Sequence, residues 1–418
     1  MQPVELRIPG SYYDSQIYSG NLYLWSMDGA LITIDWNDLI SRIDVNRSLS
    51  LALYCALQRS EYLYSEQFSL IFGDPDIRNL LLSKFNLLAQ SPIDISQEVL
   101  ESCISEKQDN PFSFPHSDSG IYNGNLFVGG QEGVHFSDTH AIEPRPDRLT
   151  DLPTLGIALG SGRLALAAGG EGVHQLDVFP SPTGVFRPVA SKYANCVRWM
   201  QVALFASSMA SEGAFVDFKT TPRKKSDDSG RPPERTIRGI LSIDEIFGDQ
   251  TSVDHVWGAE DRICVARAGR IDVVKFWPRR RLSERFERIG SLTDSMKGKG
   301  DFVSGDIAVF GFVTEFDRGV LVMDSSLQST WLEGEPVNWR VFPRSRYYTN
   351  HLHVIQEDHL SVFSFNGDYF VDQGKKVSGI DVGPRSFSGG RRTTYVPRQK
   401  AGDPRPSLLG TGETWKLN

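Results

Sequence analysis

The hydrophobic positions of this chain recur as pairs of short apolar runs, each pair separated by a polar turn that contains Gly. The segments "GNLYLWSMDGALITID" at 20–35 and "GNLFVGGQEGVHFSD" at 124–138 share an opening Gly-Asn-Leu and a closing Asp. A third, "GRLALAAGGEGVHQLD" at 162–177, repeats the Glu-Gly-Val-His of the second. Apolar runs flanking an Asp-Gly or Glu-Gly turn are typical of antiparallel β-hairpins. We therefore predict a hairpin in each segment, with Gly133 and Gly172 at equivalent turn positions.

Four weaker copies of the same pattern follow along the chain, at 201–218, 261–276, 306–324 and 351–366. From the second copy onward, successive copies start 38, 39, 60, 45 and 45 residues apart. A four-stranded propeller blade takes roughly 40 to 50 residues, so each hairpin would supply two strands of one blade. Repetition has a physical reason, because one such sheet cannot bury both of its faces unless neighbouring sheets pack against it.

On these seven hairpins the chain resembles a divergent β-propeller of the WD-repeat-like or quinoprotein-like kind. The resemblance stops at architecture, because the Gly-His and Trp-Asp signatures of WD repeats do not occur at regular positions. It implies an all-β fold of seven blades, or of six if the copies at 201–218 and 261–276 share a blade. It also implies that an N-terminal strand around "PVELRIPG" completes the last blade and closes the ring.

A helical insertion is predicted at 41–107, after the first hairpin. Asp74 and Pro75 form a helix start signal, and Ile77, Leu81, Phe85 and Leu88 keep to one side of the helix that follows. Two interpretations stay open for this element. It is either a cap that covers one propeller mouth or a blade edge, with its apolar side buried internally, or a docking surface for another protein, with Ile77, Leu81, Phe85 and Leu88 as the contacts.

Basic residues gather in three other segments. The segment 219–238 carries seven Lys or Arg against three Asp or Glu, and 385–418 carries seven against two. Low apolar content predicts that both are flexible, so we assign 1–384 to the propeller and 385–418 to a tail. The segment 278–288 adds five Arg against two Glu. The basic candidates for partner binding are Arg223, Lys224, Lys225, Arg279, Arg280, Arg281, Arg391 and Arg392.

The distribution of charge is more informative than the total. The chain is −8 overall, and removing the +4 of 219–238 and the +5 of 385–418 leaves −17 on the remainder. An acidic body with basic appendages is predicted. Mixtures of Arg and aromatic residues such as "PRRRLSERFER" also occur in nucleic-acid-binding proteins. A solvated loop, or a clamp on the acidic body, is the alternative explanation.

The motif search predicts no catalytic, metal-ligating or cofactor-binding residue. No nucleophile elbow, phosphate-binding loop or dinucleotide fingerprint stands in its required context. Cys55, Cys103, Cys196 and Cys264 lack metal-ligand spacing and are expected to be buried free thiols. Two histidine sets were considered as metal ligands, and packing or surface roles are preferred for both: His135 with His174, and His351 with His353 and His359.

The leading functional hypothesis is a non-enzymatic interaction scaffold, a propeller subunit that docks one or more proteins in a complex. The alternatives are a hydrolase or lyase with its site in the axial funnel, and a nucleic-acid-binding accessory subunit that acts through basic loops. No apolar run is long enough to span a bilayer, and the N-terminus lacks the basic and apolar regions of a secretory signal. We therefore expect a cytoplasmic protein that does not insert into membranes.

Overall fold

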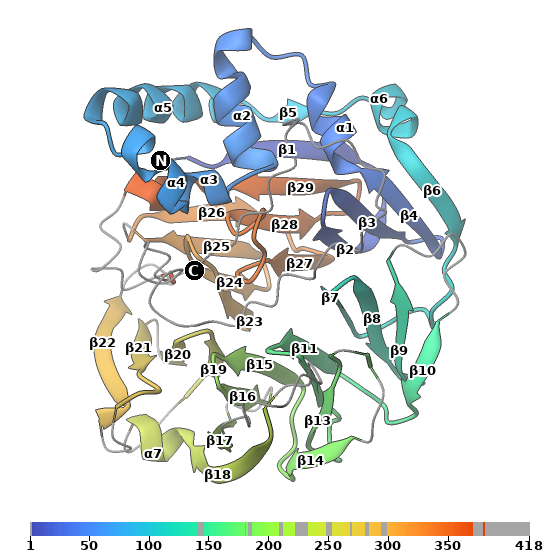
Figure 1. Ribbon diagram of the computed structural model, residues 1–418, viewed down its shortest axis with the longest axis vertical. Coiled ribbons are helices and arrows are strands. Elements are labelled where there is room, and N and C mark those ends of the chain that lie inside the picture. Colours follow the sequence, from blue (N-terminus) through green and yellow to red (C-terminus); the bar gives the residue numbers. More distant parts are fainter. Residues whose placement is uncertain are drawn as a thin grey trace, which may run out of the picture.

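Seven antiparallel sheets arranged around a common axis make up the computed structural model of the protein (Figure 1). The structure describes residues 2–380 apart from 140–145, 180, 183–185, 209–211, 222–232, 248–252, 268–269, 281–283, 294–298, 326 and 371–378. Six sheets have four strands, and the seventh has a short fifth strand at its outer edge. The first strands of successive sheets contact one another and form the inner ring.

The strands follow the chain from the inside of each blade to the outside, except in blade 7. Blade 1 consists of β2 (Tyr12–Tyr18), β3 (Asn21–Ser26), β4 (Ala30–Asp35) and β6 (Ile104–Asp109). Blade 2 consists of β7 (Asp118–Tyr122), β8 (Asn125–Gly130), β9 (Gly133–Asp138) and β10 (Asp147–Thr150). Blade 3 consists of β11 (Gly156–Gly160), β12 (Arg163–Ala167), β13 (Val173–Asp177) and β14 (Arg187–Ala190). Blade 4 consists of β15 (Cys196–Met200), β16 (Ala203–Ser207), β17 (Gly213–Thr220) and β18 (Arg235–Ser242). Blade 5 consists of β19 (His255–Ala259), β20 (Arg262–Arg267), β21 (Arg270–Phe276) and β22 (Phe286–Thr293). Blade 6 consists of β23 (Phe302–Ile307), β24 (Gly311–Phe316), β25 (Gly319–Asp324) and β26 (Ser329–Glu333). Blade 7 consists of β27 (Asn338–Val341), β28 (His351–Ile355), β29 (His359–Ser364) and β1 (Val4–Pro9), with β5 (Ile93–Asp94) beside β1.

The seven repeated hairpins are the two middle strands of the seven blades. The prediction of an all-β propeller with seven blades is confirmed. The six-bladed alternative is wrong, because the copy at 201–218 lies in β16 and β17 of blade 4, whereas the copy at 261–276 lies in β20 and β21 of blade 5. The middle strands are the most strongly apolar of each blade because neighbouring blades cover both of their faces.

The ring is closed by the N-terminal strand, as the resemblance implied. Strand β1 pairs antiparallel with β29 over six positions, from Val4 opposite Ser364 to Pro9 opposite His359. Its outer edge pairs in parallel with β5, where Leu6 and Arg7 lie opposite Ile93 and Asp94. Joining early and late segments in one sheet removes the open edge that blade 7 would otherwise present.

The repeated Glu-Gly turn has a steric basis. Gly133 has φ of 101° and Gly172 has φ of 79°, in the left-handed region that favours glycine. A Cβ atom would lie 1.9 Å from the carbonyl oxygen of Thr150 at Gly133, and 2.2 Å from that of Ala190 at Gly172. The same role in adjacent blades, a close approach to the next strand, explains why both copies retain glycine.

The predicted helical insertion is present between β4 and β6 of blade 1. Most of its helices lie outside β1, at the top of Figure 1, while its middle part lies against blade 7, where Ser60 and Tyr64 bond to Tyr347 and Asn350. The fourth strand of the blade, β6, begins at Ile104, within the segment predicted as insertion. The helical elements are α1 (Trp36–Ser41), η1 (Arg47–Leu49), α2 (Ser50–Leu57), α3 (Glu61–Tyr64), α4 (Glu66–Phe72), α5 (Pro75–Leu88) and α6 (Gln97–Ser102), with α7 (Ile243–Phe247) and η3 (Gly367–Phe370) elsewhere in the chain. No helix in the described part of the chain is long and apolar enough to cross a bilayer.

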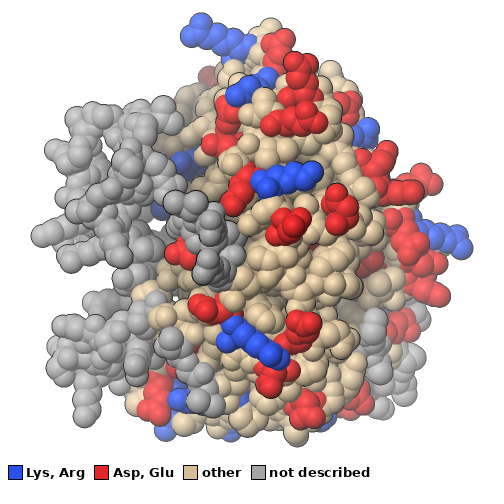
Figure 2. All heavy atoms as spheres, turned by 90° about the vertical axis from the view of Figure 1, so that its right-hand side faces the viewer, with Lys and Arg blue, Asp and Glu red and all other residues tan. Residues whose placement is uncertain are grey.

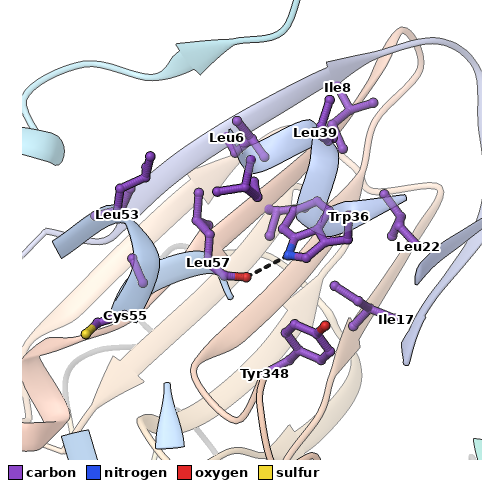
Figure 3. Packing of buried hydrophobic residues seen from close by; sticks show 14 of the residues in the cluster. Leu6, Ile8, Ile17, Leu22, Trp36, Leu39, Leu53, Cys55, Leu57 and Tyr348 are labelled. Carbon is purple, nitrogen blue, oxygen red and sulfur yellow. Dashed lines mark hydrogen bonds between the residues drawn. The ribbon is translucent and has the colours of Figure 1, made fainter. Parts of the chain in front are cut away.

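The insertion is anchored on the seam between blades 7 and 1. Its helices share one buried cluster with β1, with Ile17 and Leu22 of blade 1, and with Leu360 of blade 7. Trp36 is fully buried, and its indole Nε1 donates a hydrogen bond of 2.7 Å to the carbonyl oxygen of Leu57 (Figure 3). Burial of so many large side chains makes the insertion part of the folded core of the ring closure.

Three histidines in the blades, His351 and His353 fully buried and His255 half-buried, are expected to make stability depend on pH. Burial lowers the pKa of His255 and of His351 to about 4, and it holds the pKa of His353 well below its usual range. These rings are neutral in the fold, whereas an unfolded histidine takes up a proton below about pH 6.5. Stability from this source is therefore complete above that pH and is lost as the pH falls toward 4.

Unfolding in urea at about pH 7 and about pH 5.5 measures the effect. We expect the free energy of unfolding to fall by about 1 kcal/mol for each of the three histidines. The variants His255→Gln and His351→Gln should each lose about a third of this decrease, because each removes one of the three groups. Equal stability at the two pH values would show that these rings are protonated in the fold.

Candidate docking surface

Helix α5 has one apolar side packed inward against α2, α4 and η1 of the insertion. Leu81, Phe85 and Leu88 are 4%, 0% and 5% exposed and belong to the cluster at the ring closure. The helix begins where the sequence indicated, since the Asp74 carboxylate accepts hydrogen bonds from the backbone N–H groups of Asp76 and Ile77. This side of α5 is the buried cap that the sequence analysis offered as one of two interpretations.

A second apolar stripe on α5 faces solvent. Ile77, Leu80 and Leu87 are 38%, 57% and 47% exposed. Spacings of three, seven and ten residues place these side chains along one face of the helix, next to the buried face. Leu70 and Ile71, at 88% and 50% exposure, extend the stripe onto α4, which packs on α5. We name these five residues the α4–α5 apolar surface.

The two long cationic side chains near this surface are engaged within the chain. Lys84 occupies the stripe between Leu80 and Leu87 in the helical sequence, and its Nζ donates a hydrogen bond of 3.3 Å to Ser48 Oγ. The guanidinium of Arg78 lies over the ring of Tyr369, with 5.5 Å from Cζ to the centroid. The leucines are therefore left uncovered by their nearest long side chains. Adjoining exposed apolar residues of this kind are typical of surfaces that bind proteins.

Of the predicted contacts, the structure brings Ile77, Leu81, Phe85 and Leu88 onto one helix, but only Ile77 is accessible. Leu70, Ile71, Leu80 and Leu87 were not predicted. The signal was present, because "PDIRNLLLSKFNLL" contains two adjacent apolar stripes where a helix with one buried side needs a single stripe. The neighbouring helices α2 and α4, which lie outside the sequence of α5, decide which stripe packs inward.

The basic candidates are only partly within the described structure. Arg279 and Arg280 are exposed, and Arg280 donates a 2.9 Å hydrogen bond to Glu287 and lies 4.4 Å from the ring centroid of Trp277. This arrangement binds Arg280 to its own blade. The others lie outside the described residues: Arg223, Lys224, Lys225, Arg281, Arg391 and Arg392. The ends of 219–238 belong to β17 and β18.

One side of the molecule is predominantly acidic. Figure 2 shows this side, which carries α6, β6 and β10 at the right of Figure 1, with more Asp and Glu than Lys and Arg side chains. Exposed Glu101, Asp109 and Asp147 belong to these elements. The view agrees with the prediction of an acidic body.

Charged side chains of the inner strands meet at the propeller axis. Arg340 of β27 donates from Nε and Nη2 to the two carboxylate oxygens of Asp14 in β2, at 2.5 and 2.8 Å, and from Nη1 to Asp118 of β7 at 2.9 Å. On the other side of the ring, Arg198 Nε donates to Asp306 at 3.0 Å. Burial opposes ionisation of Asp14 and Arg340, yet their mutual attraction lowers the pKa of Asp14 and raises that of Arg340. Asp14 and Arg340 therefore form a buried ion pair.

A loop from blade 7 crosses the ring at one end of the axis. Arg344, three residues after β27, donates hydrogen bonds to the carbonyl oxygens of Leu159 in blade 3 at 3.1 Å and Trp199 in blade 4 at 2.7 Å. It also forms an ion pair with Glu260 of blade 5. Because blade 7 lies opposite these blades, the Arg344 side chain spans the axial opening.

The histidines and cysteines take up packing and structural positions. His351 is fully buried, and its Nε2 lies at a hydrogen-bonding distance of 3.0 Å from the carbonyl oxygen of Ala56. His174 is half-buried on β13, and Cys55, Cys103 and Cys264 are buried free thiols. In the described portion of the protein, no three His, Cys, Asp or Glu side chains are grouped to hold a metal ion.

Comparisons with known proteins add a likeness of fold. No protein-family model matches the chain, and no curated protein matches it. Among solved structures, the β-propeller domain of Cps50 (Swd1) from Myceliophteria thermophila is similar with a TM-score of 0.49 and 11% sequence identity. The match covers 85% of this chain and 97% of that domain. The propeller architecture itself is established by the seven sheets.

Proposed function

We propose that this protein is a non-enzymatic interaction scaffold, and that a partner protein docks on the α4–α5 apolar surface. The observation that supports it is the pair of stripes on α5, one holding the helix to the ring closure and the other facing solvent. The buried stripe fixes the position of the exposed one, so the surface is presented on a rigid support. A partner with an apolar face of its own would bury Leu80 and Leu87 and gain the free energy of removing them from water.

The propeller axis favours this function over a hydrolase or lyase. An enzyme would need charged groups free to act on a substrate, whereas Arg340, Asp14, Asp118, Arg198 and Asp306 bond to one another. The Arg344 side chain additionally spans one end of the axis. For nucleic-acid binding the described structure offers no comparable support: Arg280 is paired with Glu287 within its own blade, and most of the other basic candidates lie outside the described residues.

Co-purification of the full chain from its native source tests the proposal. We expect Leu80→Glu combined with Leu87→Glu to reduce the recovered partner by at least about tenfold, because two charges would enter a dry contact. The complex of the unchanged protein with its partner should stay intact at about 0.5 M salt, because the Debye length there is near 4 Å and exposed charge pairs are screened. Mass spectrometry of the retained material identifies the partner.

The chain offers a closely matched control on the same helix. Asn79 and Asn86 are exposed, and they directly precede Leu80 and Leu87. The double variant Asn79→Glu with Asn86→Glu therefore adds the same two charges at the same spacing. This variant should retain the partner. Equal loss in both variants would mean that charge on α5, and not the apolar contact, controls binding. Binding that resists both pairs of substitutions would place the interface elsewhere.

A further inference from the structure

Three arginines gather where blades 3 and 4 meet. Arg163 and Arg187 begin β12 and β14 of blade 3, and Arg235 begins β18 of blade 4. Because neighbouring strands are antiparallel, the starts of β12, β14 and β18 lie at the same side of the sheets as the end of β13, which carries Asp177. Arg163 Nη2 donates a hydrogen bond to the carbonyl oxygen of Pro233, two residues before Arg235. This bond joins the two blades at the cluster.

The cluster contains more positive than negative charge. Arg163 Nε forms a 2.9 Å ion pair with Asp177, and the Asp177 carboxylate also attracts Arg235. Three guanidinium groups against one carboxylate leave a formal charge of +2. Burial, followed by the charge of Arg163, lowers the pKa of Arg235 to about 10. A buried cation without a full counter-charge is costly, so the site as it stands lacks negative charge.

Several hydrogen-bonding atoms of the cluster are also unused. Arg163 is 3% exposed, and within the described structure its buried Nη1 has no acceptor. The same holds for the buried Nε and Nη1 of Arg235, whose guanidinium lies 5.3 Å from the ring centroid of Trp199. Gln175 Oε1, two residues before Asp177 on the same face of β13, is a buried acceptor without a donor. Unsatisfied buried polar atoms are rare in folded proteins, and here four belong to one cluster.

We propose that this cluster, at the seam of blades 3 and 4, binds a phosphate ion. Monohydrogen phosphate carries the two negative charges that the cluster lacks. Its tetrahedral oxygens can accept from N–H groups pointing in several directions, as those of Arg163 and Arg235 do. Its remaining hydroxyl can donate to Gln175 Oε1, which a carboxylate ion cannot do. Asp177, with its side chain 45% exposed, and the exposed Arg187 mark the solvent side of the site.

Thermal unfolding of the full chain with added sodium phosphate tests the proposal. Sodium chloride at matched ionic strength and sodium acetate serve as the other two salts. Phosphate at about tenfold its Kd should raise the melting temperature by about 1 to 2 °C beyond the effect of chloride. Arg235→Gln and the exposed Arg187→Gln should lose this rise. Arg318→Gln should keep it, because Arg318 is exposed on another blade with only a 3.9 Å ion pair to Asp317.

A direct titration of phosphate by calorimetry completes the experiment. Binding to the unchanged protein and to Arg318→Gln, weakened at least about tenfold in Arg187→Gln, would support the site. Arg187→Gln retains the buried groups, so it remains informative if Arg235→Gln does not fold. A rise that is equal in phosphate and chloride, or equal in all variants, would overturn the proposal. An equal rise in acetate would overturn the assignment to phosphate.

Discussion

Leu6→Ala is expected to lower the free energy of unfolding by about 3 to 5 kcal/mol, the upper part of the range for a large-to-small change in a core. Leu6 is fully buried in β1, opposite Val362 of β29 and beside the parallel strand β5. The side chain contributes to the cluster that joins blade 7, blade 1 and the helical insertion. A cavity there weakens all three elements at once, because neither neighbour can move inward without opening the ring.

The adjacent residue provides the control for this experiment. The side chain of Arg7 is 42% exposed and pairs with Glu5 on the same strand. Arg7→Ala should cost less than about 1 kcal/mol, as is usual for exposed ion pairs. Urea unfolding followed by circular dichroism measures both variants. If Leu6→Ala and Arg7→Ala were equally mild, β1 would be dispensable for stability and ring closure would rest on other contacts.

Asp14→Ala and Arg340→Ala are each expected to destabilise the protein by about 3 to 5 kcal/mol, because each leaves a buried partner without its counter-charge. The Asp14 side chain is fully buried and that of Arg340 is 16% exposed, so water can replace little of what is lost. Asp14 also accepts hydrogen bonds from Ser119 at 2.6 Å and from Asn338 at 3.1 Å. Removing it therefore affects three blades.

The double variant separates the ion pair from general damage. Its cost should be smaller than the sum of the two single costs by at least about 1 kcal/mol, since the second substitution no longer breaks an intact pair. Arg318→Ala, which removes an exposed arginine with a 3.9 Å ion pair, should change stability by less than about 0.5 kcal/mol. Strict additivity of Asp14→Ala and Arg340→Ala would mean that the two residues act independently.

The blade count could be predicted because the middle strands are covered on both faces, which forces long apolar runs such as those of β12 and β20. Inner and outer strands lack this constraint. Strand β6 alternates between partly buried and exposed residues, and all four residues of β27 are only partly buried. Their patterns are too weak to recognise alone, so the insertion was predicted with an end inside β6.

The docking surface and the arginine cluster were harder to predict, for different reasons. On α5 the sequence indicated an apolar helix, but only its packing against α2 and α4 determines that Phe85 faces inward while Leu80 faces solvent. Arg163 and Arg235 lie far apart in the sequence and meet through the packing of two blades. Likewise, Asp14 and Arg340 are 326 positions apart, and no local pattern indicates such a pair.

The pairing of β1 with β29 imposes an order on biosynthesis. A ribosome adds about 5 to 20 residues per second, so β1 waits roughly 20 to 70 s for its antiparallel partner, which is encoded some 355 positions later. Its parallel partner β5 and the helices that bury Leu6 are made within the next hundred or so residues. The insertion can thus shield the nascent strand from aggregation while the other blades are translated, acting as a chaperone within the same polypeptide.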